Sequence, residues 1–281
     1  MTAQKPGPTT AHEEVDTWAM APSQVRSFID RVRAETDEQA APGQRIQYGQ
    51  DSGEQYLRVH HPPQGETRGL VVLVHGGLWR AELTLDMMTP SAVALAEDGW
   101  TVANIEYRRK GSGDDVRDSA EDLIRAIDEV RSALPGLEDA PRRLLGHSVG
   151  GTLAFGLAAS RPFDEVIMVG AVCDLPGAAF AGLGGGSIAE FCGGGPDAAG
   201  DIYAAVDPLT LLDRIGSTTI RLVHGEDDDR IPPVQSRRLY RRATAHGREC
   251  SLDLVPGAGH FAFLDPASEP WGVATRSLRS D

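Results

Sequence analysis

The pentapeptide GHSVG at residues 146–150 constrains the fold of this chain more than any other feature of its sequence. A strand predicted at 142–148 ends at the serine, and small residues typical of a tightly packed helix follow at 149–160. A sharp turn from strand to helix puts a serine at its apex, and flanking glycines remove the Cβ atoms that would clash there. The helix N-terminus brings backbone N–H groups and a positive dipole end beside that serine. The sequence therefore predicts that Ser148 is a nucleophile.

Strand-like and helix-like segments alternate along most of the chain. Two strands at 45–49 and 54–62 flank the turn signal DSG, and the apolar run at 69–76 is typical of a strand buried on both faces. Further strands are predicted at 100–107, 142–148, 165–172, 218–226 and 250–257, and helices at 91–97, 116–134 and 149–160. This order predicts an α/β fold with an eight-stranded, mostly parallel sheet and helices on both faces.

Two stretches do not follow this alternation. Residues 1–40 predict a flexible arm followed by an amphipathic helix at about 23–35, which leaves 41–281 as the main domain. Inside that domain, 9 of the 25 residues at 176–200 are glycine. A long glycine-rich loop is either a floppy surface segment or a flap over a site, and we favour a short cap at about 176–206.

The segment HGGLW at residues 75–79 directly follows the third predicted strand. Acyl transfer puts negative charge on an oxygen in the transition state, and two converging N–H donors stabilise it. Gly76 or Gly77 can provide one donor and Val149 the other, which predicts an oxyanion hole. The alternative is an ordinary strand-to-helix turn. We expect His75 to shape this loop by hydrogen bonding and not to transfer protons.

A serine hydroxyl needs a base, because it is a poor nucleophile at neutral pH. His260 follows the last predicted strand in the turn GAGHF, and it comes last in the order serine, acid, histidine. The other histidines lie in the arm, on strands, beside the nucleophile or at element ends, namely His12, His60, His61, His75, His147, His224 and His246. We therefore predict that His260 is the base.

The base in turn needs a carboxylate that orients it. The segment HGEDDDRIP at 224–232 follows the seventh predicted strand and contains four acidic residues. Asp227, Asp228 and Asp229 are candidates there, and Asp174 after the sixth strand competes with them. The residue pattern alone leaves this choice open.

Composition and missing motifs exclude several functions. A net charge of −14 argues against nucleic acid, whose phosphates repel such a field. Neither a signal peptide nor an apolar run long enough for a bilayer is visible, and three widely spaced cysteines do not suggest a disulfide framework. We expect a cytoplasmic protein that does not interact with membranes. Phosphate-loop and zinc motifs are missing, so we expect neither cofactor nor metal.

The motifs HGGLW, GHSVG, HGEDDDRIP and GAGHF together resemble the α/β-hydrolase superfamily. More narrowly, they look like the esterase/amidase branch that includes kynurenine formamidases. An HGG-x-W oxyanion motif is typical of that branch, and the stretch NIEYRR at 104–109 also resembles it. The resemblance covers about residues 45–271. The family's acid segment, H-G-x-x-D-x-x-V-P, maps onto His224, Gly225, Asp228, Ile231 and Pro232. The resemblance therefore implies that Asp228 is the acid.

This resemblance implies a serine hydrolase that cleaves a small ester or amide through an acyl-enzyme, with N-formylkynurenine as one candidate substrate. Trp79, Phe191 and Phe261 are candidate substrate-binding residues, and core packing is the alternative for Trp79. A general carboxylesterase or a biosynthetic tailoring hydrolase or cyclase is the main rival. A ligand-binding protein that has lost catalysis is a further one. The expected partner is a small molecule, and the sequence is compatible with a homodimer.

Overall fold

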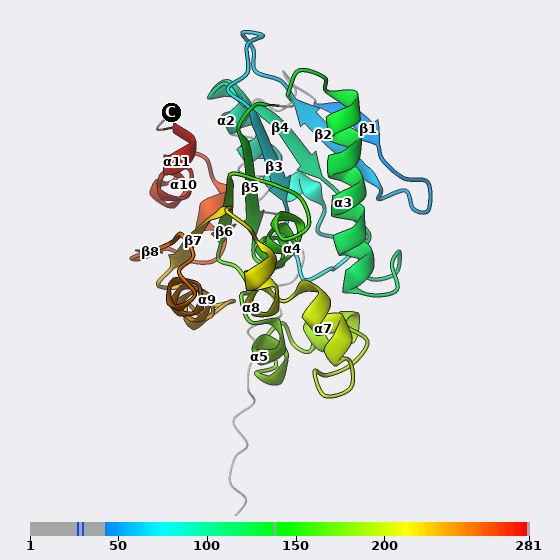
Figure 1. Cartoon of the computed structure of the whole chain (residues 1–281), viewed down its shortest axis with the longest axis vertical. Helices are drawn as coiled ribbons and strands as arrows, with labels where there is room; N and C mark the ends of the chain where they lie inside the picture. The colour runs from blue at the N-terminus through cyan, green and yellow to red at the C-terminus, as the bar shows by residue number, and fades with distance from the viewer. Residues whose placement is uncertain (1–26, 28–29, 31–42, 138, 280–281) are drawn as a thin grey trace, which may run out of the picture.

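The chain folds around one large β-sheet, which runs through the middle of Figure 1. The computed structural model describes Ser27, Asp30 and residues 43–137 and 139–279. The strands are β1 Gln44–Gln47, β2 Tyr56–His60, β3 Leu70–Val74, β4 Thr101–Ile105, β5 Arg142–His147, β6 Glu165–Val169, β7 Thr219–Gly225 and β8 Cys250–Val255. Their order in the sheet is β1-β2-β4-β3-β5-β6-β7-β8. Strand β2 pairs antiparallel with β1 and β4, and all other pairs are parallel. The predicted eight-stranded, mostly parallel sheet is confirmed.

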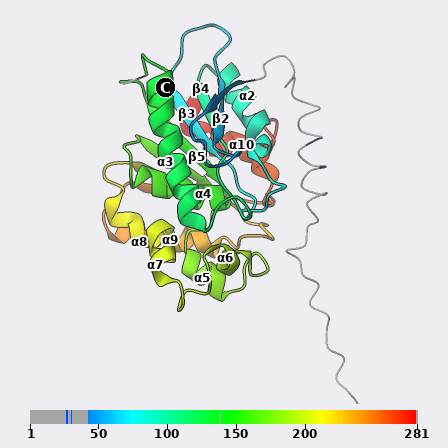
Figure 2. The same cartoon turned by 90° about the vertical axis from the view of Figure 1, so that its right-hand side faces the viewer.

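Helices follow the strands and cover the sheet. The helices are α2 Thr89–Glu97, α3 Val116–Ala133, α4 Val149–Ala158, α5 Leu175–Phe180, α6 Ser187–Phe191, α7 Gly200–Val206, α8 Pro208–Leu211, α9 Val234–Ala245, α10 Glu269–Ala274 and α11 Arg276–Arg279. Short 3₁₀ turns lie at η2 Leu85–Met88, η3 Leu212–Arg214 and η4 Ala262–Leu264. Figure 2 shows α3 and α4 on one side of the sheet and α2 and α10 on the other.

The central strands are apolar throughout because their side chains alternate between two buried layers. In β3, Leu70, Val72 and Val74 pack into the layer that includes α3, α4 and α9. The intervening Val71 and Leu73 pack into the layer that includes α2, α10 and α11. Two-sided burial therefore explains why this strand reads as a continuous apolar run.

The glycine-rich cap differs from the irregular loop that we expected. Residues 175–206 contain the helices α5, α6 and α7, which Figure 2 shows together at one end of the sheet. Glycines with positive φ delimit these helices: Gly186 (φ 85°) directly precedes α6, and Gly193 (φ 74°) follows it. Apolar side chains such as Ile188 and Tyr203 are buried in the main core, so the segment gains stability by packing. Its role as a flap stays a prediction.

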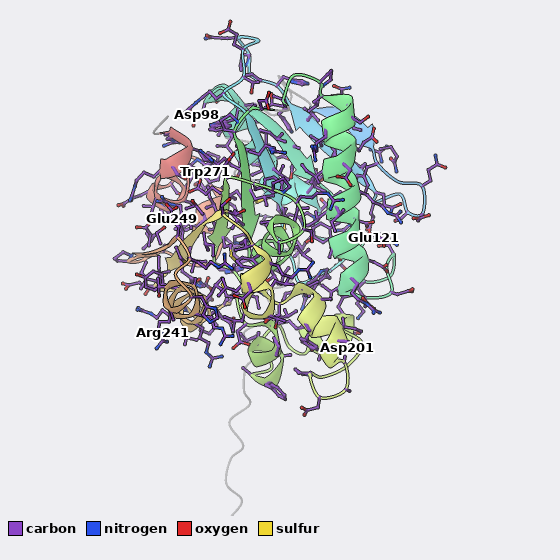
Figure 3. All side chains as sticks on the ribbon, viewed as in Figure 1. Asp98, Glu121, Asp201, Arg241, Glu249 and Trp271 are labelled. Atoms are coloured by element: carbon purple, nitrogen blue, oxygen red, sulfur yellow. The ribbon has the colours of Figure 1, made fainter. Side chains whose placement is uncertain are left out.

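The predicted N-terminal arm and most of the amphipathic helix at 23–35 lie outside the described residues. Ser27 and Asp30 are helical and exposed there. Many charged side chains are exposed, and Figure 3 labels five of them on the periphery: Asp98, Glu121, Asp201, Arg241 and Glu249. The labelled Trp271 of α10 is instead buried against the sheet. None of the helices in the described part of the chain is long and apolar enough to cross a membrane.

Candidate active site

Ser148 lies at the sharp turn that joins β5 to α4, as the sequence predicts. Its backbone has φ 57° and ψ −127°, a conformation that L-residues rarely adopt outside functional turns. Its N–H donates to the carbonyl of Val169 at the end of β6, and α4 begins at the next residue. The side chain is therefore held at the carboxyl end of the central strands, beside the N-terminus of a helix.

Two glycines allow this turn to pack against the end of β3. A Cβ atom on Gly150 would lie 2.2 Å from the carbonyl oxygen of Val74, so no other residue fits there without moving the backbone. A Cβ on Gly76 would lie 2.8 Å from the Cβ of Ser148. The predicted oxyanion loop and the predicted nucleophile are therefore in direct contact.

The loop after β3 has an unusual backbone. Gly77, Leu78 and Trp79 all have positive φ, at 113°, 51° and 56°. A left-handed conformation costs about 1–2 kcal/mol for a residue with a side chain, so surrounding contacts have to hold it. The N–H of Gly77 donates to no acceptor among the described residues. Val149 is the first residue of α4, where a backbone N–H has no acceptor within its helix. Both donors can therefore serve an oxyanion.

A buried carboxylate from the segment after β4 supports this loop. Glu106 is 1 % exposed and accepts hydrogen bonds from His75 Nε2 at 2.8 Å and from the backbone N–H of Leu85 at 2.9 Å. His75 Nδ1 lies 2.7 Å from the carbonyl of Gly76, so the ring lies between the Gly76 carbonyl and the Glu106 carboxylate. Burial alone would raise the pKa of Glu106, but the His75 ring and Arg109 lower it below its ordinary value.

Arg109 binds the far end of the same loop by hydrogen bonds. Its guanidinium donates to the carbonyls of Ala81 and Leu83, at 2.9 and 2.7 Å, and forms an ion pair with Glu54. The hydroxyl of Tyr107 donates to the carbonyl of His75 at 2.7 Å, and the two rings stack at 4.4 Å. We did not predict these roles from the sequence. The available signal was that charged residues directly follow a buried strand in NIEYRR.

The predicted base and acid lie together at the ends of β7 and β8. His260 Nδ1 donates to Asp228 Oδ2 at 2.8 Å, and both residues are buried. The other carboxylate oxygen of Asp228 accepts from the backbone N–H groups of Arg230 and Ile231, at 2.9 and 2.8 Å. This turn fixes the direction of the carboxylate, and the carboxylate fixes which ring nitrogen of His260 carries the hydrogen.

The competing carboxylates point elsewhere. Asp174 accepts from the N–H of Gly177 at 2.8 Å, which caps α5, and it forms an ion pair with Arg238. Asp227 and Asp229 are exposed, and Asp229 lies 3.4 Å from the guanidinium of Arg230. Of the four aspartates considered, Asp228 is the one in contact with His260.

A second histidine contacts Asp228 from its other side. His224 Nε2 donates to the carbonyl of Ile231 at 2.7 Å and lies 3.3 Å from Asp228 Oδ2. Burial alone would raise the pKa of Asp228, but its hydrogen bonds to His224 and His260 hold this pKa well below the ordinary value. Asp228 therefore stays ionised at neutral pH. His224 is fully buried, which is typical of a structural residue.

The three aromatic residues predicted to bind substrate take different positions. Trp79 is 0 % exposed and stacks on Phe191 of the cap at 5.1 Å, which favours the core-packing alternative for this ring. Phe261 is half-buried and packs edge-on against the His260 ring at 5.0 Å. Substrate contact by any of them stays a prediction.

The sheet order and the strand–serine–helix turn define this protein as an α/β-hydrolase. Residues 98–274 match the prolyl oligopeptidase family, and the chain belongs to that family. It is therefore a serine hydrolase that acts on ester or amide bonds.

Solved structures of several esterases share this fold. Esterase B from Lactobacillus rhamnosis superposes with a TM-score of 0.74 at 18% identity, and the alignment covers 92% of each chain. A truncated carbohydrate esterase from gut microbiota superposes with a TM-score of 0.71 at 19% identity. The alignment covers 83% of this chain and 93% of the other. Thermogutta terrifontis esterase 2, phosphonylated by sarin, superposes with a TM-score of 0.66 at 20% identity. The alignment covers 84% of this chain and 92% of the esterase. At these identities the likeness concerns the fold, and neither these structures nor the family points to the formamidase branch.

Proposed function

We propose that this protein is a carboxylesterase that cleaves small esters of short acyl chains, with Ser148 as nucleophile, His260 as base and Asp228 as the orienting acid. The observation that carries this proposal is the 2.8 Å bond between His260 and Asp228. It lies at the same end of the sheet as Ser148, and the His260 ring is 4.6 Å from the ring of the residue that precedes the serine.

Each of these groups has a distinct role in the proposed reaction. His260 accepts the proton of Ser148 while the serine oxygen attacks the ester carbonyl, and the ionised Asp228 stabilises the imidazolium that forms. The N–H groups of Gly77 and Val149 bind the oxyanion. His260 then protonates the leaving alcohol, and water repeats these steps on the acyl-enzyme.

Two features favour esters with short acyl chains. Gly76 contacts Ser148 directly, and the adjacent Trp79 is buried against Phe191, so fixed atoms lie next to the candidate oxyanion hole. Esterase B was crystallised with a tributyrin phosphonate, and esterase 2 from Thermogutta terrifontis with propionate, both of which carry short chains.

A formamidase activity depends on the HGG-x-W resemblance alone, and we keep it as the second candidate. A formyl anilide such as N-formylkynurenine has a compact acyl group, as a short-chain ester does. The two candidates therefore differ in the leaving group and not in the residues that would act.

A substrate panel tests the proposal. The purified protein would be assayed with nitrophenyl esters of increasing acyl length, with a formyl anilide, and with a prolyl peptide anilide that represents the peptidase members of the family. We expect the highest kcat/KM for acetyl to butyryl esters. A clear preference for the formyl anilide would support the second candidate, and a preference for the peptide would contradict both.

The assignment of the nucleophile needs its own control. We expect Ser148→Ala to lower kcat by at least roughly 10³-fold and to abolish labelling by a fluorophosphonate probe. The exposed Ser251 provides a matched control, and Ser251→Ala should behave like the native protein. Activity or labelling that survives in Ser148→Ala would overturn the proposed site.

A further inference from the structure

The residue before the nucleophile makes a bond that the proposed reaction does not use. His147 is the last residue of β5 and is 1 % exposed. Its Nε2 lies 2.9 Å from the backbone carbonyl oxygen of His260, and the two imidazole rings pack at 4.6 Å with a tilt of 48°. The strand that carries the nucleophile therefore contacts the loop that carries the base directly.

The partner of this bond determines the state of the ring. A carbonyl oxygen only accepts, so Nε2 of His147 carries the hydrogen and donates it. Burial, followed by the neighbouring His260, lowers the pKa of His147 to about 3, so the ring is neutral at neutral pH. Its Nδ1 is then unprotonated, and it is buried without a hydrogen-bond partner among the described residues. The ring therefore makes a single directional bond, to the main chain of His260.

Two bonds hold His260, and they act on different parts of it. Asp228 binds the side chain through Nδ1 and sets the rotation of the ring. His147 binds the main-chain carbonyl and sets the position of the residue relative to β5. Ser148 directly follows His147 in the chain. The second bond therefore links the residue next to the nucleophile directly to the main chain of the base. A 1 Å displacement of a reacting group can lower a rate by about 10²-fold.

We propose that His147 is a positioning residue, whose Nε2–H bond to the His260 carbonyl holds the base at working distance from Ser148. This proposal rests on the proposed roles of Ser148 and His260. It assigns no proton transfer to His147, because its one N–H is committed to the carbonyl. It also gives a chemical reason for a histidine directly before Ser148 in the GHSVG turn, where a buried N–H donor is needed.

Two substitutions separate the bond from the volume of the ring. His147→Leu fills a similar space and removes the donor, whereas His147→Gln keeps an N–H group at a comparable reach. We expect His147→Leu to lower kcat on the best ester by about 10- to 10²-fold, with KM changed less than about 3-fold. We expect His147→Gln to retain kcat within about 5-fold of the native value. The exposed His61 supplies the control, and His61→Gln should leave both constants unchanged.

A second readout covers the case in which His147→Leu is poorly folded. The proton between His260 Nδ1 and Asp228 gives a far-downfield NMR signal, which reports on the position of the base without turnover. We expect this signal in the native protein and in His147→Gln, and a shifted or broadened signal in His147→Leu with an unchanged fold by circular dichroism.

The outcomes are distinct. Native kcat in His147→Leu would overturn the positioning role, and so would an equal loss in both variants with an unshifted signal. If Ser148→Ala keeps its activity, the proposed function fails first, whatever the His147 variants show.

Discussion

The loop after β3 and the loop after β7 both present groups to the candidate active site, but different kinds of bonds hold them. In the β7 loop, local bonds hold the carboxylate: the N–H groups of Arg230 and Ile231 bind Asp228, two and three residues away. The β3 loop depends on a carboxylate from another segment, since Glu106 binds the N–H of Leu85 across 21 positions of the sequence. Arg109 reaches the same loop from the same segment.

This difference has consequences for how each loop responds to substitution. A local turn keeps its shape when a neighbouring segment changes, because its acceptor and donors move together. A loop held by buried charges from elsewhere is more vulnerable, since removal of one charge leaves its partners buried and unpaired. A substitution in the β7 loop should therefore reduce mainly activity, whereas one in the β3 loop should reduce both activity and stability.

The largest expected effect is that of Asp228→Asn on kcat. The amide still has an oxygen for the two N–H groups, so the turn should be kept, and the stability should fall only by what the ionised carboxylate contributes. The amide cannot hold His260 in the working tautomer or stabilise its cation, and we expect kcat to fall by roughly 10⁴-fold. Steady-state kinetics and a thermal melt measure the two effects. The exposed Asp227 is the matched control, and an equal loss in Asp227→Asn would refute the assignment.

Glu106→Gln should affect stability most. It removes the charge that His75 Nε2 and the N–H of Leu85 bind, while Arg109 keeps its ion pair with Glu54. By analogy with other broken buried pairs, this costs about 3–5 kcal/mol of unfolding free energy. Urea denaturation measures this change, and kcat should fall as well because Gly77 is displaced. Glu190, which pairs with Lys110 at the surface, is the control. We expect Glu190→Gln to cost less than about 1 kcal/mol, and equal losses in the two variants would contradict the distinction between the loops.

Lowering the pH should reduce the free energy of unfolding in two steps. Below a pH of about 6.5 the unfolded chain protonates His147, but the folded chain does not until about pH 3, so stability falls by up to roughly 1.4 kcal/mol per pH unit. Below about pH 4 the stability should fall further, because Asp228 and Glu106 have lowered pKa values in the folded protein. The unfolded chain therefore takes up protons at these two residues first.

Thermal melts between pH 8 and pH 3 separate these two steps. His147→Gln should flatten the dependence between about pH 6.5 and 4, and Glu106→Gln should flatten it only below about pH 4. His60 is also buried and its pKa is lowered to about 4, so part of the upper step should remain in His147→Gln. A pH profile that neither substitution changes would show that these groups do not control acid stability.

The amino-acid sequence determined the order and class of the elements. Strand periodicity, two-sided apolar runs and the GHSVG turn are local properties, and all eight strands lie where they were predicted. The sequence also pointed to Ser148 and His260 as candidates, because glycines mark the turns that carry them. For the acid, the residues alone left four aspartates open, and the family resemblance selected the one that contacts His260.

Only the tertiary structure decided how these parts are supported. The side chain of Asp228 points inward because N–H groups two and three positions later bind it, which a run of three aspartates does not reveal. Glu106 and His147 act across 21 and 113 positions of the sequence. The cap helices and the burial of Trp79 under Phe191 likewise depend on packing between distant segments. Long-range contacts of this kind depend on where the sheet places the ends of its strands, so no local pattern encodes them.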